Sequence, residues 1–186
     1  SAGADLWARL KREEDTRKYQ RRGVVFATHP ATDERMSDIR AAADALPDPP
    51  RERRRDEYRA AMRPFMDRWL AEELGRRRYA SSLLVIGDLL ADAPAEDHGL
   101  LAFYLGEAHR RRNATGDRAK AADLYARAIA LPGAPAATWR EHGFALREAG
   151  KKVDAIAALK RYLDLAPQAD DRAFVQRELE KTGERP

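Results

Sequence analysis

The sequence has no cysteine, few β-branched residues and no long apolar run. Without cysteine, disulfides and thiolate zinc sites are excluded. The longest apolar stretch, around residues 83–86, is far too short to span a membrane. Sparse β-branched residues disfavour sheet, whereas abundant Ala, Leu, Arg and Glu favour long amphipathic helices. We therefore expect an all-α protein, and its 186 residues are enough to bury a core.

The chain begins with Ser1 rather than Met and shows no signal peptide, so we expect a piece of a longer protein. Its formal net charge is +4, with 35 Lys and Arg against 31 Asp and Glu. Basic residues cluster at 51–55, 76–78 and 110–112, but acidic residues are interleaved throughout and no nucleic-acid-binding motif is visible. The charge favours solvated helix faces, so we predict no nucleic-acid partner and no membrane span.

Two copies of one pattern lie 34 residues apart in the C-terminal part of the chain. The positions are Gly116, Ala121, Tyr125 and Ala128, repeated as Gly150, Ala155, Leu159 and Tyr162. Upstream of the second set, Trp139, Gly143 and Leu146 supply a bulky residue, a small residue and a packing residue, and Pro167 ends the second helix. Small residues let the two helices approach closely, and Gly150 permits the turn between them. The period and the pattern resemble tetratricopeptide (TPR) repeats over residues 58–168.

The other copies are looser. In the middle copy Gly106 lies three positions early in the 34-residue register, and we expect extra loop residues within 110–116 to absorb the difference. Pro64 is expected to break the preceding helix and to open the first copy. The residues assigned to that first copy are Trp69, Gly75, Ala80, Leu84 and Pro94.

We therefore predict a TPR-type right-handed array of helical hairpins over residues 49–186. Its repeats are expected at about 58–95, 98–133 and 136–168, followed by a capping helix at 170–182. Asp170 or Asp171 would cap that last helix, and an apolar face of Phe174, Val175 and Leu179 would cover the end of the array.

Residues 1–48 do not follow the repeat. Leu6, Trp7 and Leu10 predict one helical face. A second helix is expected after Thr32, with Asp33 and Glu34 in its first turn. Its apolar stripe would be Met36, Ile39, Ala43 and Leu46, and the proline-rich segment 47–50 marks the boundary.

The segment 26–36, FATHPATDERM, resembles the Thr-His-Pro-x-x-x-x-Arg-hydrophobic element that ends the catalytic domain of HtpX-like and CAAX-prenyl-protease-like zinc metallopeptidases. The resemblance covers roughly residues 4–46 and is carried by Thr28, His29, Pro30, Arg35 and Met36. One branch of that family, exported bacterial proteases, has a TPR array directly behind this element. The resemblance implies that residues 1–48 are the last two helices of a metallopeptidase-like domain, whose parent lies in the periplasm or cell envelope.

The His-Glu-x-x-His motif, which supplies two zinc ligands and the general base in those proteases, is absent from this chain. The histidines are His29, His98, His109 and His142, and no two are four residues apart. We therefore predict no catalytic residue and no cofactor for this chain, with zinc in the parent by resemblance. His29 is either a lid or additional zinc ligand in the parent, or a loop histidine bonded to backbone.

By TPR register, six side chains should face a concave groove that binds a protein or peptide partner. They are Phe103, Glu107, Arg110, Arg140, Phe144 and Arg147. Aromatic rings flanked by arginines could hold an extended peptide or a chain end, although a merely solvated face is the alternative. Tyr125, Trp139 and Tyr162 are expected in the core. Glu107 with His109, and Glu141 with His142, could form a metal site, but packing or solvation explains these pairs better.

Two functions from different classes follow. The first is a protein- or substrate-recruiting TPR module in the C-terminal part of a zinc metallopeptidase. The second is a TPR scaffold or adaptor that is linked to no protease. The sequence determines neither the partner nor the oligomeric state.

Overall fold

The computed structural model describes residues 2–16, 32–45 and 54–184, and these residues are helical with no strand among them. The predicted all-α class is confirmed. The α-helices are α1 (Ala2–Asp15), α2 (Thr32–Asp44), α3 (Arg55–Gly75), α4 (Tyr79–Asp92), α5 (His98–Arg112), α6 (Asp117–Ala128), α7 (Ala137–Glu148), α8 (Lys152–Leu165) and α9 (Arg172–Glu184). A short 3-10 helix, η2 (Ala95–Asp97), directly precedes α5.

The chain divides into two compact units, Ser1–Met66 and Asp67–Pro186. In the first unit α1 packs against α2. The guanidinium of Arg35 lies 5.1 Å from the centre of the Trp7 ring, and Lys11 forms an ion pair with Asp33. A cation over an aromatic face is attracted by the ring quadrupole. These two contacts therefore hold the described parts of the pair together.

Fewer apolar side chains are buried in this helix pair than the sequence suggests. Helix α2 begins at Thr32 as predicted, and Met36, Ile39 and Ala43 are half-buried; Leu46 lies outside the described residues. On α1, however, Leu6 is 57% exposed and Leu10 is 39% exposed. The side chains of α1 that meet α2 are Trp7 and its i+4 neighbour Lys11.

Helix α3 corrects the expected break at Pro64. It runs without interruption from Arg55 to Gly75, with Pro64 inside it. Proline removes one backbone donor and crowds the preceding turn, which disfavours an interior position but does not forbid it. The residues on both sides of Pro64 are good helix formers, and the helix therefore continues through it.

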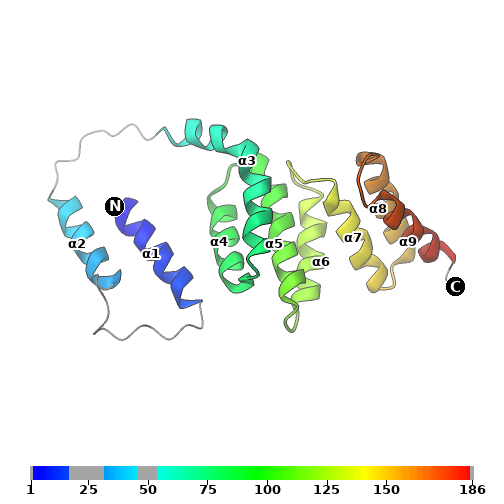
Figure 1. Cartoon of the computed structure of the whole chain (residues 1–186), viewed down its shortest axis with the longest axis horizontal. Helices are drawn as coiled ribbons and strands as arrows, with labels where there is room; N and C mark the ends of the chain where they lie inside the picture. Colours follow the sequence, from blue (N-terminus) through cyan, green and yellow to red (C-terminus); the bar gives the residue numbers. More distant parts are fainter. Residues whose placement is uncertain (1, 17–31, 46–53, 185–186) are drawn as a thin grey trace. The chain divides into compact units, whose positions relative to one another are not determined.

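The second unit is a stack in which each helix packs on the next one along the chain, from α4 to α9. The helices alternate in direction and lie side by side (Figure 1). Short turns make this possible. Gly116 precedes α6 with φ 81°, and Gly150 lies between α7 and α8 with φ 75°. Only glycine adopts this left-handed region without strain, so both predicted turn positions are confirmed.

Two glycines let the helices of each hairpin approach closely. A Cβ added to Gly106 of α5 would lie 2.7 Å from the Tyr125 ring of α6, and one added to Gly143 of α7 would lie 2.8 Å from the Leu159 side chain of α8. Tyr125 and Leu159 are 34 residues apart, so the two glycines play the same packing role. The three-residue offset of Gly106 is therefore absorbed before Gly116, as predicted.

The α3–α4 pair follows a different register from the one expected. Trp69 is 43% exposed, and Ala80 is also exposed, whereas Leu74, Ser82 and Ile86 are fully buried. The small and bulky positions of α4 are therefore two residues later than the predicted Ala80 and Leu84. The assignment of the first copy by sequence is wrong, because α4 is so apolar that several alignments place hydrophobic residues equally well.

Helix α9 covers one end of the stack. Val175 is fully buried among Leu159, Tyr162 and Leu163, and Leu179 packs partly buried against them. Phe174 departs from the expectation, because it is 48% exposed and meets the edge of the Phe144 ring instead, at 6.1 Å between ring centres. The cap thus buries part of its predicted apolar face and leaves an aromatic ring beside α7.

Candidate functional site

The first feature of the candidate site is a buried carboxylate on α5. Glu107 is only 3% exposed. Arg110 binds it with two hydrogen bonds of 2.7 and 2.8 Å, and Tyr125 donates its hydroxyl at 2.7 Å. Arg111 adds a further hydrogen bond of 3.1 Å. Burial by itself raises the pKa of Glu107, but these donors outweigh it and the net pKa is lowered, so the group stays ionised.

Helix α7 continues the same pattern. Arg140 donates to Glu141 at 2.9 Å and also pairs with Asp171, the residue before α9. The Tyr162 hydroxyl donates to that aspartate as well, and the guanidinium of Arg140 lies over the Tyr162 ring. Burial raises the pKa of Asp171, yet Tyr162 and Arg140 lower it on balance. Asp171 stands where a helix cap was predicted, but its carboxylate is used to join α7, α8 and α9.

A third contact joins α7 to α9. Arg147 forms a hydrogen bond of 2.6 Å with Glu178, and its guanidinium lies 5.1 Å from the centre of the Phe144 ring. Phe144 in turn meets Phe174. Because Phe174 is half-exposed, the two rings present an aromatic edge on the same side of the stack as Arg147.

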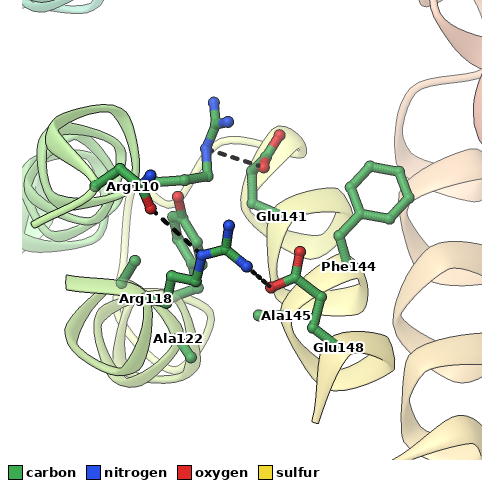
Figure 2. Close-up of a pocket in the computed structure, with 10 residues that line it drawn as sticks. Arg110, Arg118, Ala122, Glu141, Phe144, Ala145 and Glu148 are labelled. Atoms are coloured by element: carbon green, nitrogen blue, oxygen red, sulfur yellow. Dashed lines mark hydrogen bonds and ion pairs between the residues drawn. The ribbon is translucent and has the colours of Figure 1, made fainter. Parts of the chain in front are cut away.

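A pocket of about 320 Å³ opens between α5, α6 and α7, hereafter the α6–α7 pocket. Its apolar lining residues are Ala121, Ala122, Tyr125, Phe144 and Ala145, and its exposed lining is as polar as it is apolar. Arginines come from the α5–α6 side and glutamates from α7, namely Arg110, Arg118, Glu141 and Glu148. Figure 2 shows them as two pairs, Arg110 beside Glu141 and Arg118 beside Glu148. The pocket therefore combines an apolar floor with a rim of balanced charge.

Two ion pairs cross the mouth of the pocket, and both are loose. Arg110 Nε lies 3.4 Å from Glu141, and an Arg118 nitrogen lies 3.8 Å from Glu148 (Figure 2). Arg118 and Glu148 have side chains that are 73% and 61% exposed. An exposed ion pair of this kind contributes only about 0–1 kcal/mol, so it opens at little cost.

The structure places five of the six predicted groove residues in the network or at the pocket, and the sixth in the core. Glu107, Arg110, Arg140, Phe144 and Arg147 lie in the network or at the pocket that joins α5, α7 and α9. Phe103, by contrast, is 7% exposed and packs on Tyr104 and Tyr125 in the core. Each predicted arginine already has an intramolecular carboxylate partner. The surface is thus a cross-linked face rather than an open row of cations.

Several network residues were missed, although a signal for some of them exists in the sequence. Glu141, Asp171 and Glu178 each lie 31 residues after the arginine that they bind, which is Arg110, Arg140 and Arg147 respectively. The recurring 31-residue offset is the sequence signal for these three partners. Arg118 and Glu148 belong to no such series, and only the fold brings them together.

The metal-binding alternatives have no support among the described residues. No group of three His, Asp or Glu side chains in those ranges could hold a metal ion. His109 hydrogen bonds to Asp117 at 2.8 Å, and the histidine of the Glu141–His142 pair lies in a separate pocket beside Trp139 and Asp154. Thr28, His29 and Pro30 lie outside the described residues, whereas Arg35 stacks on Trp7.

Tyr125 and Tyr162, predicted as core residues, are confirmed at 1% and 3% exposure, and Trp139 is partly buried against the same core. No helix in the described ranges is both long and apolar enough to cross a bilayer. A scan with protein-family models gives no match to this chain, and a search of curated proteins gives none either.

Proposed function

We propose that α3–α9 form a TPR-type array that binds an extended segment of a partner protein across α5, α7 and α9. The observation that carries the proposal is the α6–α7 pocket, which lies next to the exposed Phe144–Phe174 edge. Helical hairpins with a 34-residue correspondence and close glycine contacts support the TPR assignment. Pockets with apolar floors and a few polar groups are the usual sites for peptide anchors.

Selection from a random peptide library displayed on phage, with the full chain as bait, tests this proposal. We expect binders whose affinity falls about tenfold or more with Ala122→Trp, which fills the pocket, and about as much with Phe144→Ala; tenfold corresponds to about 1.4 kcal/mol. Ala157→Trp is the matched control, because Ala157 is an exposed alanine of α8 outside this pocket.

Two results would contradict the proposed groove. One is a set of peptides that bind the Ala122→Trp and Phe144→Ala variants as well as they bind the original chain. The other is binding that depends instead on the exposed cluster Arg76, Arg77 and Arg78, which would indicate a purely electrostatic surface.

The connection to a zinc metallopeptidase is a second layer of the proposal. It is supported by the Thr28-His29-Pro30 element with Arg35 and by the order of the two parts along the chain. In this view the array recruits substrates or partners and the catalytic groups lie in the parent protein. Sequencing the gene upstream of Ser1 is the direct test. A His-Glu-x-x-His motif there supports the protease, and an open reading frame that continues upstream without it favours the scaffold or adaptor.

A further inference from the structure

Each charged side chain at the rim of the α6–α7 pocket is paired with an oppositely charged side chain of the same protein. Arg110 is held by Glu107 through two hydrogen bonds and faces Glu141, while Arg118 faces Glu148. The two arginines and the two rim glutamates cancel. A carboxylate from a ligand would therefore have to displace a carboxylate of the chain, and would meet Glu141 and Glu148 at close range.

We propose that this pocket selects an extended peptide anchored by an uncharged apolar side chain, and discriminates against acidic tails and free chain ends. This inference rests on the proposed function, since it names the ligand chemistry of the same groove. The partner is a protein segment with a Leu-, Met- or Phe-like residue in its interior, flanked by residues of low net charge.

The interior of the pocket matches such an anchor. Ala121, Ala122 and Ala145 contribute only methyl groups, so they leave room between α6 and α7. The Phe144 ring forms part of the apolar lining and continues to Phe174 outside the pocket. An apolar side chain gains free energy by leaving water for this surface, whereas a charged one would lose its hydration without an unpaired partner to replace it.

The exposed ion pair at the mouth predicts the salt dependence of binding. An apolar anchor that enters the pocket separates the Arg118–Glu148 pair, and added salt weakens an exposed pair of this kind. Binding of an apolar-anchored peptide should therefore stay constant or strengthen as salt rises. Binding of an acidic peptide, driven by attraction to arginine, would weaken instead.

The experiment uses the peptides selected on the full chain, resynthesised with amidated and with free C-termini. Fluorescence polarisation measures the dissociation constant at about 50 mM and about 500 mM NaCl, where the Debye length falls from well above 10 Å to well below it. We expect enrichment of one interior apolar position and less than about a twofold loss of affinity at high salt. Amidation should have an effect of less than about twofold, and replacing the anchor by Asp should reduce affinity by about tenfold or more.

A charge-reversal variant sharpens the test. Glu148→Lys, on the exposed rim, removes one mouth-crossing pair and leaves the rim positive. It should allow acidic peptides to bind that the unmodified chain rejects. Selection of acidic or C-terminal motifs by the unmodified chain, with steep salt weakening, would overturn this inference but keep the groove. Absence of any pocket-dependent peptide would overturn both.

Discussion

At the scale of single residues, Asp117 shows how the stack fixes a turn between helices. Its side chain is fully buried and accepts hydrogen bonds from Arg112, His109 and the backbone N–H of Ala114. These donors come from the end of α5 and from the loop, while Asp117 begins α6. A single carboxylate therefore closes the α5–α6 hairpin.

We predict that Asp117→Ala destabilises the protein by about 2 kcal/mol, because it removes the buried acceptor of several hydrogen bonds, including the one from the backbone N–H of Ala114. Urea unfolding followed by circular dichroism measures the change. Asp123→Ala is the control, since Asp123 is an exposed residue of the same helix, and it should cost less than about 0.5 kcal/mol. Equal effects of the two substitutions would show that the Asp117 network contributes nothing.

The same residue predicts the acid response. The hydrogen bonds from Arg112, which outweigh the opposing effect of burial and are aided by His109, lower the pKa of Asp117 below its ordinary 3.8. A carboxyl group with a lowered folded pKa contributes stability that is complete above the unfolded pKa and is lost as the pH falls through the folded pKa. We expect this contribution to be full at pH 6 and to decline below about pH 4. Melting temperatures across that range should fall less steeply for Asp117→Asn than for the original chain.

Arg110 is a residue whose role the sequence could not give. Its spacing suggested a groove cation, but the structure shows that it neutralises the buried Glu107. Nothing in the sequence marks Glu107 as buried, because a glutamate on a charged helix is normally solvated. For that reason Arg110→Ala perturbs stability as well as binding, and Ala122→Trp is a cleaner probe of the groove.

At the scale of elements, glycine-to-alanine substitutions distinguish the effect of close helix packing from the effect of helix propensity. Gly106→Ala and Gly143→Ala would each place a methyl group within 3 Å of a side chain on the neighbouring helix. Gly87, in the middle of α4, has nothing within 4 Å of such a methyl group.

We predict that the first two substitutions destabilise by about 1–3 kcal/mol through overpacking, whereas Gly87→Ala stabilises by up to about 1 kcal/mol because alanine favours the helix. Thermal and urea unfolding of the three variants checks the opposite signs. A stabilising Gly143→Ala would show that α7 and α8 do not approach as closely as described.

The hairpins differ in how far sequence could predict them. In α5–α8 the glycine, alanine and aromatic positions recur with little ambiguity, and the structure places them as expected at Gly143, Ala155 and Leu159. In α3–α4 the hydrophobic residues are too many to define one register, and Ser82 rather than Ala80 occupies the small buried position. Pairing across helices, such as Arg118 with Glu148, depends on the final packing and has no local signal.

At the scale of the whole molecule, we predict that the chain alone binds no zinc stoichiometrically at sub-micromolar concentration. Zinc sites in proteins use three or four N, O or S ligands at about 2 Å. The sequence has no cysteine, and its one motif-supported ligand is His29. Calorimetric titration of the full chain with zinc measures this. Tight binding that disappears with His29→Ala would reveal a metal site in the chain.

The chain of ion pairs along α5, α7 and α9 has a mechanical consequence. Glu141 of α7 is bound by Arg110 and by Arg140, and Arg140 also binds Asp171, so α5, α7 and the start of α9 are linked through two adjacent side chains of α7. When a ligand separates Arg110 from Glu141, the interaction of Glu141 with Arg140 adjusts. Because Arg140 also binds Asp171, the change reaches α9. We therefore expect a ligand in the pocket to change the curvature of the stack gradually over several helices rather than at a single hinge.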